Sequence, residues 1–310
     1  MSTWNRTGPV VVEVDGSAEN LRVVDYACAE ALRVGAKLVL IAPYSTHDPA
    51  PDPVHDSAPG SPPQYAPVPP GELADAAVRA AVAHVRYRDG SATELAAVTE
   101  QGSRLRVLAH AARNARMLVV GRSRSRGPQR LLHTQANLRL AARAGCPVVV
   151  VPLSWRPSVL DRKVAVGIDG TALSAEALEF AFGEAAGRDG DLTVVHAGLP
   201  AERAWSEEDP ECSWISRADY LLSETLAPWT SRFPDVKVTR FLSSRPPAAA
   251  LVHESSSVGL VVVGAHGGVL PVDPVARRSL AAMTCPVAVV PHRLTDGERQ
   301  VVPRRDAVVR

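Results

Sequence analysis

The sequence predicts an α/β protein made of two tandem doubly wound domains, each built on a five-stranded parallel sheet. Three observations favour this fold class. Short valine-rich runs alternate with segments of helical period, the alternation occurs twice, and the landmarks of the first half recur in the same order in the second. Unbroken apolar runs suit strands covered on both faces, as in parallel sheets. At 310 residues the chain is long enough for two domains of ordinary size.

Each half begins with a strand, a polar turn and a helix. The stretch VVVEVDGS, from Val10 to Ser17, matches VAVGIDGT, from Val164 to Thr171, and both lead into an apolar-periodic helix. Later landmarks pair in order along the two halves: 36–44 with 191–198, 117–122 with 260–265, and 144–152 with 283–291. Each half is therefore predicted to contain five strands alternating with four helices.

The repeat divides the chain into predicted domains. The first covers residues 1–153, and its connection 43–70 carries ten prolines in 28 residues, which predicts a surface loop, partly extended or disordered. The second domain covers residues 161–292. Residues 293–310 show no periodic pattern and are expected to form a frayed or docking tail.

Composition argues against several classes of protein. No apolar run approaches the ~20 residues of a membrane span, and the N-terminal segment has no secretory cleavage pattern, so we expect a cytoplasmic protein without a membrane partner. The cysteines, Cys28, Cys146, Cys212 and Cys285, are too scattered for a disulfide framework or a zinc site, and Cys146 and Cys285 are expected to be buried small hydrophobes. We expect no metal.

Charge is unevenly distributed along the chain. Residues 1–160 carry 18 basic and 13 acidic side chains, whereas the rest carry 16 and 20, and the segment 101–160 has eleven arginines and no acidic residue. One explanation is that a basic half docks on an acidic half of the same chain; the other is an anionic ligand or partner. No aromatic residue interleaves with the arginines of 122–130, so we expect no nucleic-acid partner.

Topology places a candidate ligand crevice at the carboxyl ends of the strands, where the strand order reverses. Asp15 and Asp169 follow the first strand of each half, and Gly121 and Gly264 follow the fourth. An aspartate at a strand end can accept hydrogen bonds from a ribose or base, and a glycine lets backbone amides approach a phosphate. Glu13, inside the first strand, is either a crevice residue or the partner of a side chain in the Arg-rich half.

These landmarks resemble the universal stress protein family in its tandem, two-domain form. The resemblance rests on the paired V-x-V-D-G-S turn, the V-V-G after a helix, and C-P-V-x-V-V-P, and it extends from Pro9 to Pro291. It implies Rossmann-like domains that pair through their last strands, here 148–151 and 287–290, to give an internal pseudo-dimer, with a homodimer as a further possibility. Many members of the family bind ATP, and others do not.

The resemblance also implies where a nucleotide would bind. In ATP-binding members the loop after the fourth strand has the pattern G-x-x-G, nine residues, then G-S or G-T. In the first half only Gly121 matches, because Arg124 and Thr134-Gln135 occupy the other positions, whereas the second half keeps Gly264 and Gly267 in a loop four residues shorter. The tentative nucleotide site is therefore in the second half: Asp169, Gly170, Thr171, Val195, Gly264, His266, Gly267 and Gly268. Side chains of Arg122, Arg124 and Arg126 form a tentative anion site in the first.

The predicted function is that of a non-enzymatic stress-response protein acting through an unidentified protein partner or a small ligand, with degraded ATP-binding motifs. The alternative is a stress switch that binds ATP or another adenine nucleotide in the C-terminal domain. No catalytic residues are expected, because Gly121-Arg122-Ser123-Arg124-Ser125 lacks the last glycine of a nucleophile elbow.

Overall fold

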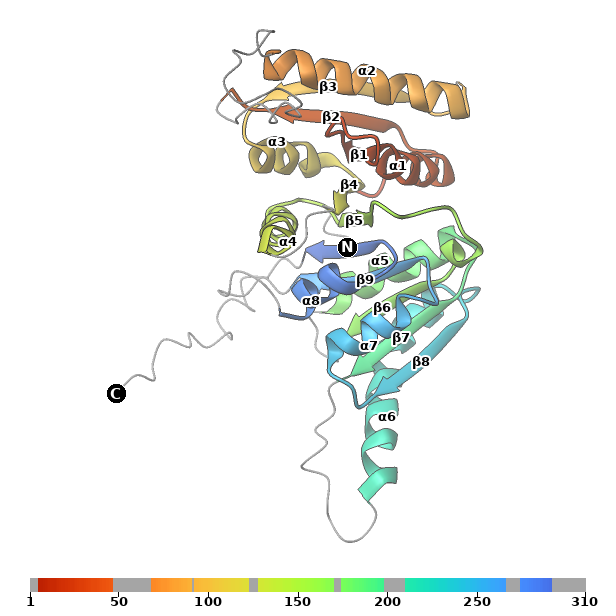
Figure 1. Ribbon diagram of the computed structural model, residues 1–310. Helices are drawn as coiled ribbons and strands as arrows, with labels where there is room; N and C mark the ends of the chain where they lie inside the picture. The colour runs from red at the N-terminus through yellow and green to blue at the C-terminus, as the bar shows by residue number, and fades with distance from the viewer. Residues whose placement is uncertain are drawn as a thin grey trace, which may run out of the picture.

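The protein is built on one continuous sheet that runs through both halves of the chain (Figure 1). The structure, a computed structural model, describes residues 5–46, 68–90, 92–122, 128–169, 174–197, 210–265 and 274–291. Its ten-stranded sheet has the order β3-β2-β1-β4-β5-β10-β9-β6-β7-β8. Neighbouring strands are parallel except at the centre, where β5 and β10 are antiparallel. In each half the strand order reverses between the first and fourth strands, as predicted.

The first domain alternates strands and helices in the expected order. Its elements are β1 (Val10–Glu13), α1 (Asn20–Val34), β2 (Leu38–Tyr44), α2 (Pro70–Asp89), β3 (Leu95–Gln101), α3 (Arg104–Ala111), β4 (Met117–Arg122), α4 (Pro128–Ala141) and β5 (Val148–Pro152). The expectation of a loop from Pro43 to Pro70 is wrong at its ends. β2 continues through Pro43 and Tyr44 because these residues pair with Glu100 and Gln101 of β3, and Pro70 opens α2. Residues 47–67 lie outside the described residues.

The second domain repeats this order after a 3-10 turn at Val159–Arg162. Its elements are β6 (Val164–Ile168), α5 (Ala175–Gly187), β7 (Leu192–Ala197), α6 (Pro210–Arg232), β8 (Val238–Ser243), α7 (Pro247–Glu254), β9 (Leu260–Ala265), α8 (Pro274–Ala282) and β10 (Val287–Pro291). The lower part of α6 extends away from the sheet (Figure 1). The tail 293–310 lies outside the described residues.

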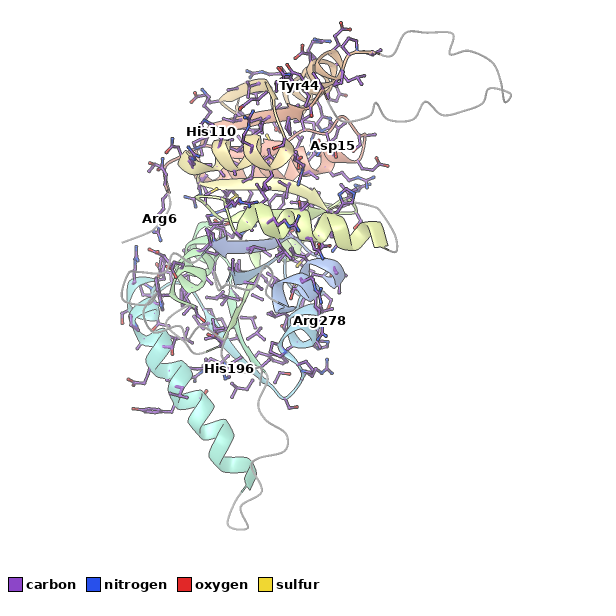
Figure 2. All side chains as sticks on the ribbon, turned by 90° about the vertical axis from the view of Figure 1, so that its left-hand side faces the viewer. Arg6, Asp15, Tyr44, His110, His196 and Arg278 are labelled. Carbon is purple, nitrogen blue, oxygen red and sulfur yellow. The ribbon has the colours of Figure 1, made fainter. Side chains whose placement is uncertain are left out.

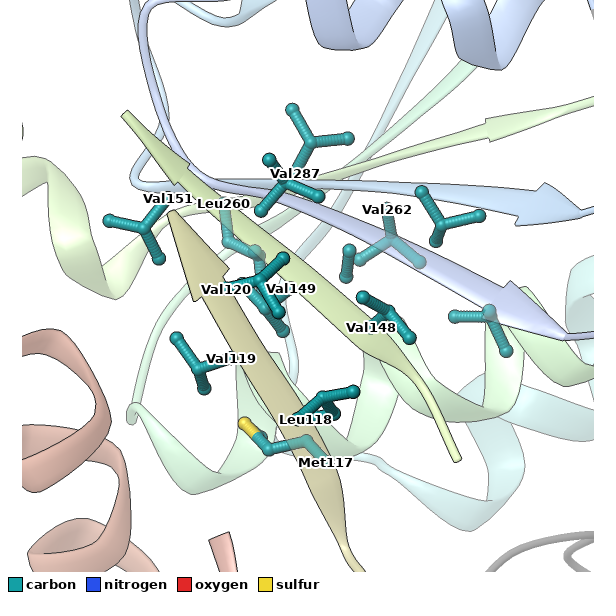
Figure 3. Close-up of a cluster of buried hydrophobic side chains, with 14 of the residues drawn as sticks. Met117, Leu118, Val119, Val120, Val148, Val149, Val151, Leu260, Val262 and Val287 are labelled. Atoms are coloured by element: carbon teal, nitrogen blue, oxygen red, sulfur yellow. The ribbon is translucent and has the colours of Figure 1, made fainter. Parts of the chain in front are cut away.

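Valines form the junction between the two domains (Figure 3). In the antiparallel pairing of β5 with β10, Val150 faces Val287, Val149 faces Ala288, and Val148 faces Val289. These side chains are 0–2% exposed. The pairing satisfies the backbone groups of both edges and covers apolar surface, so neither valine-rich edge is left open. This arrangement confirms the internal pseudo-dimer expected from the sequence.

A buried ionic cluster joins α1 of the first domain to α5 of the second. Glu30 and Glu184 occupy the same position in the two repeats, fifteen residues after Asp15 and Asp169. Arg33 pairs with Glu30 and with Glu184 at 2.6 Å, and Arg188 pairs with Glu30 at 2.6 Å and Glu184 at 3.1 Å. Each arginine thus bridges both domains.

Further cross-domain ion pairs surround this cluster. Arg116 lies 3.5 Å from Glu184, and Arg6 lies 2.5 Å from Glu179. Burial would raise the pKa of Glu184, but Arg33, Arg188 and Arg116 outweigh it and hold that pKa below its usual value. Arginines of the first half therefore pair with glutamates of the second, as expected for a basic half docked on an acidic one.

The described residues also bear on the cysteines and on membrane insertion. Cys28, Cys146 and Cys285 are free and buried, which confirms the expectation for Cys146 and Cys285. No helix in the described ranges is both long and apolar enough to cross a membrane.

Candidate ligand crevice

The first domain has an open cavity of about 670 Å³ at the carboxyl ends of β1 and β2. Its walls come from three segments: Val14 to Gly16 after β1, Ala42 to Ser45 at the end of β2, and one face of α2 that carries Leu73 and several alanines. Asp15 and Tyr44 lie at this edge (Figure 2). The volume lies within the range of small-molecule sites, and the lining is mainly apolar with one carboxylate.

Asp15 is held in place by the turn that follows β1. Its Oδ1 accepts hydrogen bonds from the backbone N of Ser17 at 2.8 Å and from the Ser17 hydroxyl at 2.7 Å. The backbone N of Asp15 donates to Asn20 Oδ1 at 3.2 Å. Gly16, between Asp15 and Ser17, has φ +80°, a backbone conformation that favours glycine. The turn therefore fixes the carboxylate at the mouth of the cavity.

A polar network lies beneath the crevice of the first domain. Arg104 donates to both carboxylate oxygens of Glu13, at 2.5 and 2.6 Å, and to Asn137 Oδ1 at 3.0 Å. Asn137 in turn donates to the backbone oxygen of Gly121 at 3.4 Å. Burial alone would lower the pKa of Arg104, but the Glu13 carboxylate raises it above its usual value. Glu13 therefore has the partner in the Arg-rich half that the sequence suggested.

Of the three arginines of the tentative anion site, the structure describes only Arg122. Arg122 ends β4, and its Nη1 donates to the backbone oxygens of Leu280 at 3.4 Å and Met283 at 2.5 Å. These carbonyls lie at the carboxyl end of α8, where a cation is favoured by the helix dipole. Arg122 thus contacts the second domain. Arg124 and Arg126 lie outside the described residues.

In the second domain the described crevice residues come from adjacent strands. Asp169 follows β6, and Gly264 lies in β9, which is the neighbour of β6 in the sheet. Ser174 donates to Asp169 Oδ1 at 2.9 Å. Val195 of β7 is 1% exposed and faces Gly167 in the register with β6, so it forms part of the core beside the crevice.

The other residues of the predicted nucleotide site lie outside the described residues. These are Gly170, Thr171, His266, Gly267 and Gly268. Among the described residues, no group of three or more His, Cys, Asp and Glu side chains could hold a metal ion.

Sequence reasoning missed several residues of the two crevices. Asn20 and Ser174 occupy the same repeat position, five residues after the crevice aspartate, and each accepts a bond from the backbone N of that aspartate. Comparison of the two repeats would have found them. His196, beside Ile168 in the register, has its Nδ1 3.2 Å from the Ile168 oxygen at the same edge (Figure 2). Tyr44 was not recognised as a crevice residue because it lies at the start of the Pro-rich connection.

Comparisons with known proteins agree with this architecture. The model of the "Universal stress protein family" matches residues 7–152 and 162–291. A universal stress protein of Mycolicibacterium smegmatis is 34% identical over 300 residues, which cover 91% of this chain and 96% of that protein. A universal stress protein of Mycobacterium tuberculosis is 38% identical over 155 residues, 49% of this chain and 52% of that protein. In that match the chain spans about half the length of its relative.

The fold is shared by a solved structure that matches nearly the whole chain. A universal stress protein from Archaeoglobus fulgidus superimposes with a TM-score of 0.65 and 13% identity, covering 94% of this chain and 98% of that chain. A universal stress protein solved in complex with cAMP is 20% identical and covers 42% of this chain and 97% of its own, with a TM-score of 0.34. Both halves match the family model and a relative matches over nearly the full length, so the chain belongs to the universal stress protein family, in its tandem two-domain form.

Proposed function

We propose that this chain is a non-enzymatic stress-response protein that binds a small nucleoside-like ligand in the crevice of its first domain and acts through ligand and protein contacts. The cavity at the carboxyl ends of β1 and β2 carries this proposal. Its apolar walls suit a flat ring, and Asp15 suits hydroxyl or amino donors on that ring or on a ribose. Because the protein binds this ligand without converting it, the fraction of protein with ligand bound follows the ligand concentration.

In the first domain, the residues at the positions of the family's phosphate loop favour a nucleoside over a nucleotide as the ligand. A phosphate loop depends on several free backbone amides beside a helix N-terminus. α4 begins at Pro128, so Thr134 and Gln135, at the closing positions of the family motif, lie inside the helix, where their amides donate to backbone oxygens. Arg122 already bonds to the end of α8. The phosphate groups of a nucleotide would therefore form few hydrogen bonds in this crevice.

Calorimetric titration with adenosine, AMP and ATP tests the proposal. We expect Ala76→Phe, which places a large ring in the cavity, to weaken adenosine binding at least tenfold. Ala83→Phe is the matched control, because Ala83 is also exposed on α2 but does not line the cavity. Binding that survives Ala76→Phe, or no adenosine binding at millimolar concentrations, would contradict the proposal.

The second candidate function is an adenine-nucleotide switch in the C-terminal domain. It is favoured by the placement of Asp169 and Gly264 on adjacent strand ends. Pro274, which opens α8, has no amide hydrogen to offer a phosphate and argues against tight binding. ATP binding lost in Gly267→Val and retained in Ala76→Phe would favour this candidate over the first.

The non-enzymatic assignment has its own test. Phosphate release from ATP by the purified protein is expected to equal the background rate of the buffer. Turnover that is lost in Asp169→Ala would instead show that the second domain is a nucleotide hydrolase.

A further inference from the structure

A second cavity, of about 550 Å³, lies along α3 of the first domain, away from the ligand crevice. Figure 2 shows His110 of α3 apart from Asp15 and Tyr44. The cavity is lined by Ser103, Leu105, Arg106, Ala109, His110, Arg113 and Arg143. Three of these residues are arginines and none is acidic. We call this cavity the α3 groove.

Close backbone packing brings the arginines of the α3 groove together. Arg113 follows α3, and Arg143 follows α4. Gly145 lies so close to the chain after α3 that a Cβ at this position would be 3.0 Å from Arg113 Cα and 3.2 Å from Arg113 O. The two segments therefore touch at the glycine, and Arg143, two residues earlier, reaches the same cavity as Arg113.

The groove arginines differ in their partners from the arginines at the domain junction. Arg33, Arg116 and Arg188 all pair with buried glutamates. In contrast, the exposed side chains of Arg113 and Arg143 have no hydrogen-bond or ion-pair partner among the described residues. Within the same described ranges, Arg106 donates only to the backbone oxygen of Gln101, at 3.3 Å. Docking of the two halves thus explains the position of the junction arginines Arg33, Arg116 and Arg188. The positive charge of the groove arginines is left uncompensated.

The second repeat shows that the fold does not require these arginines. α3 and α7 align without a gap through β4 and β9, and the two Cys-Pro pairs align the segments before β5 and β10. Arg106, Arg113 and Arg143 then correspond to Ala249, Ser256 and Ala282, whereas His110 corresponds to His253. The same architecture forms with small residues at all three positions, so the charge of the groove is a property of the first domain alone.

We propose that the α3 groove binds a soluble ligand carrying two or more phosphate groups. Guanidinium groups bind phosphate oxygens in bidentate fashion, and several converging arginines recognise a chain of phosphates. The cavity has the size of a small-molecule site and its charge is gathered in one place, which suits a compact polyanion. No aromatic residue lines the groove, so it recognises phosphates and not a base. This site is independent of the crevice proposed above.

Calorimetric titration with inorganic tripolyphosphate tests this inference on the full chain. We expect Arg113→Ser to weaken binding at least tenfold. The triple variant Arg106→Ala, Arg113→Ser and Arg143→Ala, which installs the residues of the second repeat, should abolish it. Binding to the wild-type chain should also weaken as salt rises from 50 to 500 mM, because these charges are exposed and screened.

Two controls separate a site from general attraction and from the crevice. The triple variant Arg79→Ala, Arg86→Ala and Arg88→Ala on α2 removes the same charge from exposed positions and should leave binding within twofold. Ala76→Phe should also leave tripolyphosphate binding unchanged. Circular dichroism checks that each variant is folded, and single Arg113→Ser and Arg143→Ala variants replace the triple one if it is not.

Two outcomes would overturn the inference. They are no binding of tripolyphosphate by the wild-type chain at millimolar concentration, and equal losses of binding in the groove and α2 triple variants. The first result, if ATP nevertheless binds, would mean that the base, and not the phosphate chain, is recognised.

Discussion

Glu184 is the residue on which the charge balance at the domain junction depends. Its carboxylate is 1% exposed and contacts Arg33, Arg188 and Arg116. Glu184→Gln leaves these guanidinium groups with one buried carboxylate instead of two, and breaking a buried ion pair costs about 3–5 kcal/mol. We expect that loss in the free energy of unfolding measured with urea. Glu224→Gln, at an exposed position of α6, should change it by less than about 0.5 kcal/mol. Equal effects would show that the cluster does not stabilise the fold.

The same residue predicts a pH dependence. The pKa of Glu184 is lower in the folded chain than its ordinary value of 4.5. Between these two pKa values the unfolded chain binds more protons, so stability rises with pH. The contribution is fully present above pH 4.5 and is lost as the pH falls through the folded pKa. Urea denaturation between pH 6 and 3 should therefore show a steeper acid loss for the wild type than for Glu184→Gln. Parallel curves would contradict this assignment.

The thiols of three cysteines are predicted to be unreactive in the folded chain. Burial, together with the hydrogen bond to Asp89, raises the pKa of Cys28 to about 11. Burial also raises the pKa of Cys146 and of Cys285 to about 12. Because the thiolate is the reactive form, no more than one of the four cysteines should react quickly with Ellman's reagent at pH 8. All four should react in guanidinium chloride, and fast reaction of two or more in the native chain would refute the prediction.

At the scale of elements, the glycines of α1 and α5 predict opposite effects of the same substitution. Gly35 ends α1 at φ +63°, and Gly183 lies inside α5; a Cβ at either position meets nothing within 4 Å. Gly35→Ala should therefore destabilise the protein by about 1 kcal/mol through left-handed backbone strain alone. Gly183→Ala should stabilise it by about 0.5–1 kcal/mol, as in other helix interiors. Thermal unfolding of both variants measures the difference, and a shared sign would contradict it.

The sequence predicted elements better than it predicted the site because strand and helix signals are local. Runs such as 148–151 and 287–290 gave the strands, and the repeated landmarks gave the strand order. The end of β2 was misplaced because prolines normally oppose strand pairing, yet Pro43 is tolerated in register with Glu100. Crevice residues such as His196 have no local signal, since only the register with β6 brings them to the edge.

At the scale of the whole molecule, contacts between distant segments were the least predictable. Uneven charge indicated that the halves dock, but it did not identify Glu30 and Glu184, each of which has an arginine partner in the other domain. The charge distribution also did not show which arginines form ion pairs at the junction and which line the α3 groove. Arg116 of the junction and the groove arginines lie in the same Arg-rich stretch. Only the fold shows that Arg116 pairs with a glutamate, whereas Arg113 has no such partner among the described residues.

The continuous sheet and the buried ionic cluster predict that the two domains unfold as one cooperative unit. Val149 is fully buried opposite Ala288 in the pairing of β5 with β10. Val149→Asp places an unpaired carboxylate there, at a cost of several kcal/mol, and should split a single calorimetric transition into two. Val159→Asp is the matched control, because Val159 is 87% exposed in the linker and its substitution should preserve one transition. Two separate transitions in the wild-type chain would show instead that the domains are coupled too weakly for the pseudo-dimer to act as one body.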